Sequence, residues 1–108
     1  MDTCEIIGIL HEYHVCHAND LGICELGLFG SYVKGCATDS SDIDVVVVLA
    51  KPDYLTLARI KRDLEAVFNR PVDIIRKRAN MNKELLSCIE KEAVYAHLAF
   101  LQYLLSAI

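Results

Sequence analysis

The stretch that decides the fold reads Gly30-Ser31-Tyr32-Val33-Lys34-Gly35 and then, after six more residues, Asp42-Ile43-Asp44-Val45-Val46-Val47-Val48-Leu49. The valine run predicts a strand that is buried on both faces. Because successive side chains of a strand point to opposite faces, Asp42 and Asp44 share one face while Ile43 points into the core. The stretch therefore predicts a buried strand that presents two carboxylates together at its start.

The two halves of this stretch suit two different charged groups. Neighbouring carboxylates repel each other unless a cation lies between them, and Mg²⁺ is commonly held by carboxylates together with substrate phosphates. Gly30-Ser31 directly follows an apolar segment, and a glycine there lets backbone N–H groups approach an anion. Each half alone is typical of a plain turn or a polar cap. Together, in this order, they favour phosphoryl or nucleotidyl transfer.

Residues 28 to 49 resemble the signature of the DNA polymerase β-like nucleotidyltransferase superfamily, and most of all its smallest branch, the minimal nucleotidyltransferases. That signature is a strand, Gly-Ser, a short helix with a basic residue and a glycine, and then Ser-Asp-x-Asp before an apolar strand. The family also needs a carboxylate on a later strand, and Asp73 within Pro71-Val72-Asp73-Ile74-Ile75 supplies it. Val33 and Lys34 stand where the family more often has alanine and arginine. Lys34 keeps the charge but loses bidentate phosphate geometry.

The resemblance implies an α/β fold with a small mixed sheet of about three or four strands, and a magnesium-dependent nucleotidyltransferase. Three acids would be catalytic and would hold two Mg²⁺ ions during turnover: Asp42, Asp44 and Asp73. Three further residues would bind the triphosphate of ATP or another nucleoside triphosphate: Gly30, Ser31 and Lys34. The expected reaction transfers a nucleoside monophosphate, AMP from ATP, to a hydroxyl group and releases pyrophosphate.

The acceptor is expected to come from a partner protein. Larger relatives carry a second domain that grips the acceptor, and 108 residues leave no room for one. The resemblance implies that the partner is a helical HEPN toxin, and that this chain acts as antitoxin by adding AMP to a toxin tyrosine. Two alternatives stay open: a binding module that neutralises its partner by docking alone, and nucleotidyl transfer to a small molecule.

Composition predicts a single domain over residues 1–108, with 54% apolar residues and a net charge of −4. The negative charge argues against a general nucleic-acid binder. Residues 51 to 83 nevertheless hold nine of the eleven Lys and Arg against four Asp and Glu. Within them, Arg76-Lys77-Arg78 follows the segment of the third acid. This run is either a solvated loop or a basic rim that steers a triphosphate toward the acids.

The cysteines favour a reducing compartment. They are odd in number and form no Cys-x-x-Cys pair: Cys4, Cys16, Cys24, Cys36 and Cys88. We expect reduced thiols that pack mostly as small hydrophobes. The first residues show no basic region followed by a cleavage site of small residues, so we expect a cytoplasmic protein without a secretory signal.

Periodicity predicts helices and strands in alternation, and hence an α/β sandwich. We expect helices at 3–17, from Tyr32 to Gly35, and from Asp53 to about 69–71, and strands at 23–29, 43–49 and 72–75. The third helix has its apolar stripe on Leu57, Ile60, Leu64 and Val67. A last helix starts at 80–82 and runs past Ile89, and residues 89–95 resemble the closing helix of the family.

Two further segments invite functional interpretations. His11, His14, Cys16 and His17 look like a metal cluster, but on one helix they do not converge, so we expect a polar helix face. Residues 93–108 are apolar and uncharged apart from His97, and are too short to span a membrane. They either cover the sheet or, as we favour, meet a second copy or a helical partner through Leu98, Leu101 and Leu105.

Overall fold

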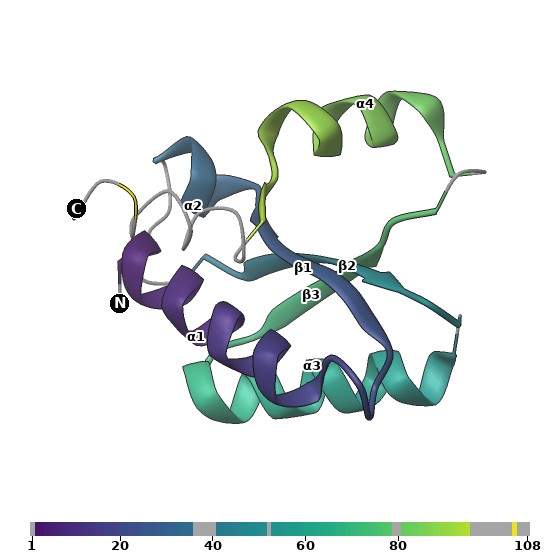
Figure 1. Cartoon of the computed structure of the whole chain (residues 1–108). Helices are drawn as coiled ribbons and strands as arrows, with labels where there is room; N and C mark the ends of the chain where they lie inside the picture. The colour runs from purple at the N-terminus through teal and green to yellow at the C-terminus, as the bar shows by residue number, and fades with distance from the viewer. Residues whose placement is uncertain (1, 36–40, 52, 79–80, 96–104, 106–108) are drawn as a thin grey trace.

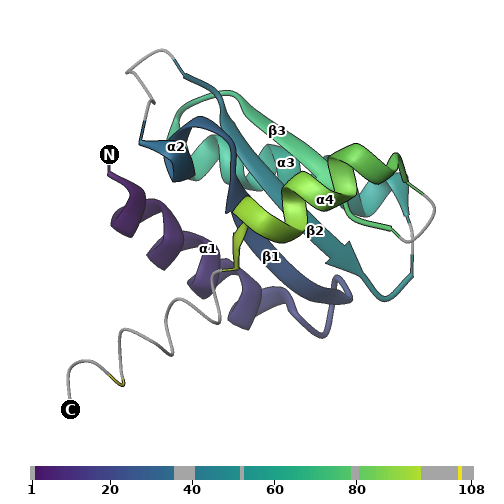
Figure 2. The same ribbon diagram turned by 90° about the horizontal axis from the view of Figure 1, so that it is seen from above.

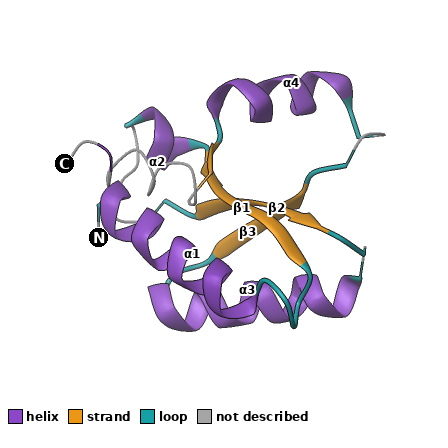
Figure 3. Ribbon diagram, in the orientation of Figure 1, coloured by secondary structure: helices purple, strands orange, loops and turns teal. Residues whose placement is uncertain are grey.

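The computed structural model describes residues 2–35, 41–51, 53–78, 81–95 and 105. Helices and strands alternate along these ranges (Figure 3), in the order α1 (Thr3–His17), β1 (Ile23–Phe29), α2 (Ser31–Lys34), β2 (Ile43–Leu49), α3 (Tyr54–Phe68), β3 (Val72–Arg76), α4 (Lys83–Glu92) and β4 (Val94–Tyr95). The predicted elements are confirmed up to the start of α4.

The strands form one sheet in the order β3-β2-β1-β4. β2 runs parallel to β3, whereas β1 runs antiparallel to both β2 and β4. The expected small mixed sheet is therefore confirmed. Helices α1 and α3 cover one face, α4 covers the other, and α2 lies at one end of the sheet (Figure 1). Seen from above, α4 crosses over the central strands (Figure 2).

The core is centred on β2, where Val45, Val46 and Val47 are buried on the two faces as predicted and Val48 is half-buried. Val45 and Val47 pack on the side of α1 and α3, in a cluster that includes Leu10 and Leu64. Val46 points the other way and packs in a separate cluster beneath α4. Burial on both faces makes β2 the rigid strand on which the segments at its ends are carried.

Helix α3 begins and ends at the residues that its sequence predicts. The side chain of Asp53 accepts a hydrogen bond of 2.9 Å from the Leu55 N–H, and Asn69 ends the helix with a left-handed φ of 54°. The predicted apolar stripe was wrong at Val67, which is 54% exposed, because Phe68 is buried instead. Phe68 continues the i, i+4 row of the buried residues Ile60 and Leu64, whereas Val67 lies at a surface hollow beside α1.

The helix predicted over residues 89–95 was also wrong after Glu92. Ala93 has an extended backbone with φ −68° and ψ 136°, and Val94 and Tyr95 pair with β1 instead. The physical reason is that Val94 and Tyr95 provide a pairing partner for an edge of β1. Valine and tyrosine also favour strands.

The predicted contacts of the C-terminal segment fall mostly outside the described residues. Leu98 and Leu101 lie outside them, and Leu105 is 72% exposed. Among the helices that the structure describes, none is both long and apolar enough to cross a membrane.

The cysteines depart from their predicted packing. The described cysteines are free thiols and are exposed, so the expectation that they pack as small hydrophobes was wrong for Cys4, Cys16, Cys24 and Cys88. Cys36 lies outside the described residues.

The packing of α3 leads to a stability prediction. Leu64→Ala should lower the free energy of unfolding by about 2–5 kcal/mol, because Leu64 is fully buried and its removal leaves a cavity. The matched control is Val67→Ala on the same helix, which should change stability by no more than about 0.5 kcal/mol. Urea unfolding of both variants checks this, and equal losses would contradict the packing described here.

Candidate active site

Three carboxylates meet at the starts of β2 and β3. Asp44 is the register partner of Asp73 in the parallel pair, and paired residues of neighbouring strands point to the same face. Ile43 is buried in the cluster beneath α1 and α3, so Asp44 and Asp73 face the side of α4. Asp42 directly precedes β2. The structure thus brings the three predicted acids to one end and one face of the sheet.

The pKa of Asp44 shows that these acids interact. Partial burial raises this pKa above its ordinary value, and the negative charges of Asp73 and Asp42 and a hydrogen bond with Asp73 raise it further. Asp44 is half-buried, whereas Asp42 and Asp73 are exposed. The site therefore carries repelling negative charge that a bound cation would relieve.

The donor set fits a hard divalent cation. Carboxylate oxygens are the ligands that Mg²⁺ and Ca²⁺ prefer, and here they come from two adjacent strands with open access from solvent. Within the described ranges, no three potential ligands are already drawn together tightly enough to hold an ion. Binding would therefore require small movements of the exposed Asp42 and Asp73 side chains.

Gly30 lies against the central acid. β1 ends at Phe29, which pairs with Asp44, and the next residue turns with φ 81° and ψ −144°. A Cβ atom at Gly30 would lie 2.3 Å from Oδ2 of Asp44. Both the backbone conformation and the close approach require glycine here. The predicted Gly-Ser turn and the predicted acids are therefore one site.

Helix α2 is anchored beside this site by Tyr32. Its buried side chain accepts a hydrogen bond from Nη1 of Arg70, whose guanidinium lies 5.9 Å from the ring centroid. The backbone oxygen of Tyr32 accepts a bond of 3.1 Å from the hydroxyl of Thr3. Sequence reasoning missed Tyr32 and Arg70, because a contact between residues 38 positions apart leaves no local pattern.

The remaining predicted phosphate ligands lie on α2. Ser31 is its first residue and is half-buried, and Lys34 is its last. The structure does not describe the side chain of Lys34. Helix α2, which carries both residues, begins directly after Gly30.

The basic run does not border the acids. Arg76 pairs with Val47, at the opposite end of β3 from Asp73. Lys77 and Arg78 line a separate hollow of about 450 Å³, together with Glu25 and Glu90. Of the two interpretations of this run, the structure therefore does not support a rim beside the acids, because the run begins at the far end of β3 from Asp73.

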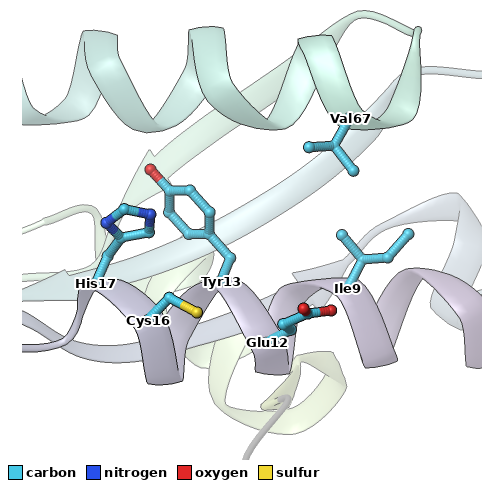
Figure 4. Close-up of a pocket in the computed structure, with 6 residues that line it drawn as sticks. All are labelled: Ile9, Glu12, Tyr13, Cys16, His17 and Val67. Carbon is cyan, nitrogen blue, oxygen red and sulfur yellow. The ribbon is translucent and has the colours of Figure 1, made fainter.

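A second hollow, of about 340 Å³, lies between α1 and α3 (Figure 4). His17, at its edge, pairs with Asp20 at 3.1 Å, and Tyr13 donates a hydrogen bond of 2.8 Å to Asp63. His14 contacts the carbonyl oxygen of Ile23 at 3.2 Å. His14 and His17 thus have separate partners on a polar helix face.

Comparison with known proteins now decides the family. Residues 14–96 match the family model of the nucleotidyltransferase domain. The chain belongs to this family of nucleotidyltransferases. It is 33% identical over 75 residues to the protein adenylyltransferase MntA of Thermococcus cleftensis, covering 68% of this chain and 75% of that one. A Methanocaldococcus jannaschii relative that bears the name protein adenylyltransferase is 29% identical over 92 residues, covering 84% and 94% of the two chains.

Solved structures agree on the fold. A structure that bears the name minimal nucleotidyltransferase has 28% identity and a TM-score of 0.70, covering 87% of this chain and 95% of that one. A toxin–antitoxin structure with AMP-PNP has 22% identity and a TM-score of 0.65, covering 79% and 70%. A complex of a tri-AMPylated Shewanella oneidensis HEPN toxin with its MNT antitoxin has 18% identity and a TM-score of 0.59, covering 83% and 71%. The predicted nucleotidyltransferase fold is confirmed.

The contact between Gly30 and Asp44 leads to a prediction. Gly30→Ala should cost about 1–3 kcal/mol of stability, because alanine is strained at this φ and ψ. It should also abolish nucleotide transfer, because the new methyl group would displace the Asp44 carboxylate.

Gly35→Ala is the matched control. Gly35 also has a positive φ of 75°, but among the described residues no atom lies within 4 Å of a Cβ placed there. This variant should lose stability through backbone strain and still transfer nucleotide. Thermal unfolding and a transfer assay separate the two effects, and full activity in Gly30→Ala would contradict the close approach.

Proposed function

We propose that this chain transfers AMP from ATP to a hydroxyl group of a partner protein, with Asp42, Asp44 and Asp73 as the catalytic carboxylates. The observation that carries the proposal is the register of Asp44 with Asp73 beside Gly30, with Asp42 close enough to raise the pKa of Asp44. Relatives that bear the name protein adenylyltransferase support the choice of AMP.

In the proposed reaction, the acceptor oxygen forms a bond to the α-phosphorus of ATP. The bond between that phosphorus and the oxygen bridging to the β-phosphate breaks, and pyrophosphate leaves. The hydroxyl proton passes to Asp73, which is exposed and therefore reachable by an acceptor from solvent. Asp44 lies between Phe29 and Asp73 in the sheet, so strand pairing keeps it within interacting distance of Asp73.

In this proposal the triphosphate lies on the side of the acids where Gly30 and helix α2 are. When bound by Asp42, Asp44 and Asp73, two Mg²⁺ ions would neutralise the triphosphate and lower the pKa of the acceptor hydroxyl. The missing side chain at Gly30 leaves room for the Asp44 carboxylate, which lies where a Cβ atom would come. The Ser31 hydroxyl and the Lys34 ammonium group supply a donor and a positive charge.

The acceptor in this proposal is a tyrosine of a HEPN-like toxin, and the chain acts as its antitoxin. Support comes from the fold neighbours, which include a toxin–antitoxin structure with AMP-PNP and a tri-AMPylated HEPN toxin in complex with an MNT antitoxin. Residues 93–108 are proposed to meet the toxin or a second copy of this chain. The 72% exposure of Leu105 agrees with a contact of that kind.

The test compares nucleotides that differ in which phosphate bond is cleavable. The chain is incubated with Mg²⁺, the HEPN toxin of S. oneidensis, and either ATP, AMP-PNP or α,β-methylene ATP. AMP-PNP has its imido group between the β- and γ-phosphates, so its α–β bond still breaks. We expect mass spectrometry to find AMP on the toxin with ATP and AMP-PNP, and none with the methylene analogue.

The control is the double variant Asp42→Asn/Asp44→Asn, whose transfer rate should fall on the order of 100-fold or more. A module that neutralises the toxin by docking alone would still inhibit the toxin in this variant. Inhibition without AMP transfer, or transfer that does not depend on the acids, would reject the proposal.

A further inference from the structure

The first residue of β3 turns its backbone polar groups away from the sheet. β3 is an edge strand, and the Ile43 N–H donates to the Pro71 carbonyl over 3.1 Å. Because neighbouring residues of a strand direct their N–H and C=O groups to alternate sides, those of Val72 face outward. Edge groups of this kind usually bond to water or attract another chain.

Two side chains of α3 bind both of these groups. The Val72 N–H donates to Oε2 of Glu65 over 3.0 Å, and Nζ of Lys61 donates to the Val72 carbonyl over 2.6 Å. Lys61 and Glu65 also pair with each other at 3.0 Å. Together they form a clamp, the Lys61–Glu65 clamp, on a single residue of the edge strand.

The clamped residue directly precedes the third acid. Asp73 lies opposite Asp44 only while β3 keeps its register with β2. The connection from α3 is short and contains Pro71, whose φ is fixed by its ring. The clamp therefore fixes the start of β3 relative to α3, on the side of the strand where the described part of the chain has no other strand.

We propose that Lys61 and Glu65 are positioning residues that hold Asp73 beside Asp44 by clamping Val72. The inference rests on the proposed catalytic role of Asp73. The hydrogen bonds of the clamp join the two side chains to each other and to the Val72 backbone, so they act on Asp73 through the backbone of β3. The rival explanation is that the clamp merely protects a strand edge, in which case its loss would leave cation binding by the acids unchanged.

The experiment uses the whole chain and three variants. Glu65→Ala removes the acceptor of the Val72 N–H, whereas Glu65→Gln keeps an oxygen at the same position. Arg59→Ala is the matched control, because Arg59 pairs with Asp63 on the same helix at 3.6 Å and Asp63 contacts Tyr13 of α1 rather than β3. Each protein is measured by amide hydrogen exchange at Val72, calorimetry with MgCl₂ alone, and kcat and KM for ATP.

In Glu65→Ala we expect exchange at Val72 to accelerate about tenfold or more, as for the loss of a hydrogen bond to a charged group. Affinity for Mg²⁺ should fall about tenfold, and kcat should fall by a similar factor while KM for ATP changes less than about twofold. Glu65→Gln should keep most of the exchange protection and Mg²⁺ affinity. Arg59→Ala should match the unmodified protein in all of these measurements.

Faster exchange at Val72 with unchanged Mg²⁺ affinity would overturn the proposal in favour of simple edge protection. If Glu65→Ala does not fold, Lys61→Met decides, because it removes the donor to the Val72 carbonyl and leaves Glu65 in place. A wild-type protein that transfers no AMP would reject the proposed function. Hydrogen exchange at Val72 and Mg²⁺ affinity would still show whether Lys61 and Glu65 position Asp73. Normal kcat and Mg²⁺ affinity in Glu65→Ala, with an active wild type, would reject the clamp alone.

Discussion

The repulsion among three carboxylates at one end of the sheet is the constraint on which the rest of this structure depends. Asp44 and Asp73 come together because β2 and β3 are parallel, so that both strands begin at the same end. Their charges, with that of Asp42, raise the pKa of Asp44. Such an arrangement lasts only where the surrounding packing determines it, and the doubly buried β2 provides that packing.

Each neighbouring segment is held in place next to these acids. Gly30 lies so close to Asp44 that a Cβ atom there would overlap the carboxylate, and Tyr32 anchors the following helix to Arg70. Arg70 belongs to the connection that leads into β3, whose first residue is clamped by Lys61 and Glu65. Helix α3 and the turn after it therefore link helix α2 to the start of β3, where Asp73 lies.

Sequence patterns predicted those parts of the site that lie within one element. The valine run, the Gly-Ser turn and the acid on the next strand each carry a local pattern. The clamp was not predictable, because Lys61 and Glu65 look like any exposed i, i+4 pair on a helix. The strand at Val94 was missed because its partner edge on β1 is remote in sequence. The sequence left open whether the basic run borders the acids, because adjacency to Asp73 does not show that Arg76 lies at the other end of β3.

The most direct test of this account compares the melting temperature of the unmodified chain with that of Asp44→Asn. Because the native state raises the pKa of Asp44, it binds this proton more tightly than the unfolded chain, and stability falls as pH rises from the ordinary carboxyl pKa through the raised one. With chelator at neutral pH, Asp44→Asn should melt a few degrees higher, and this advantage should vanish as falling pH protonates Asp44. With Mg²⁺ and ATP the order should reverse, because only the unmodified site binds them tightly. An unmodified chain that is the more stable of the two in chelator, or that gains nothing from Mg²⁺ and ATP, would contradict the account.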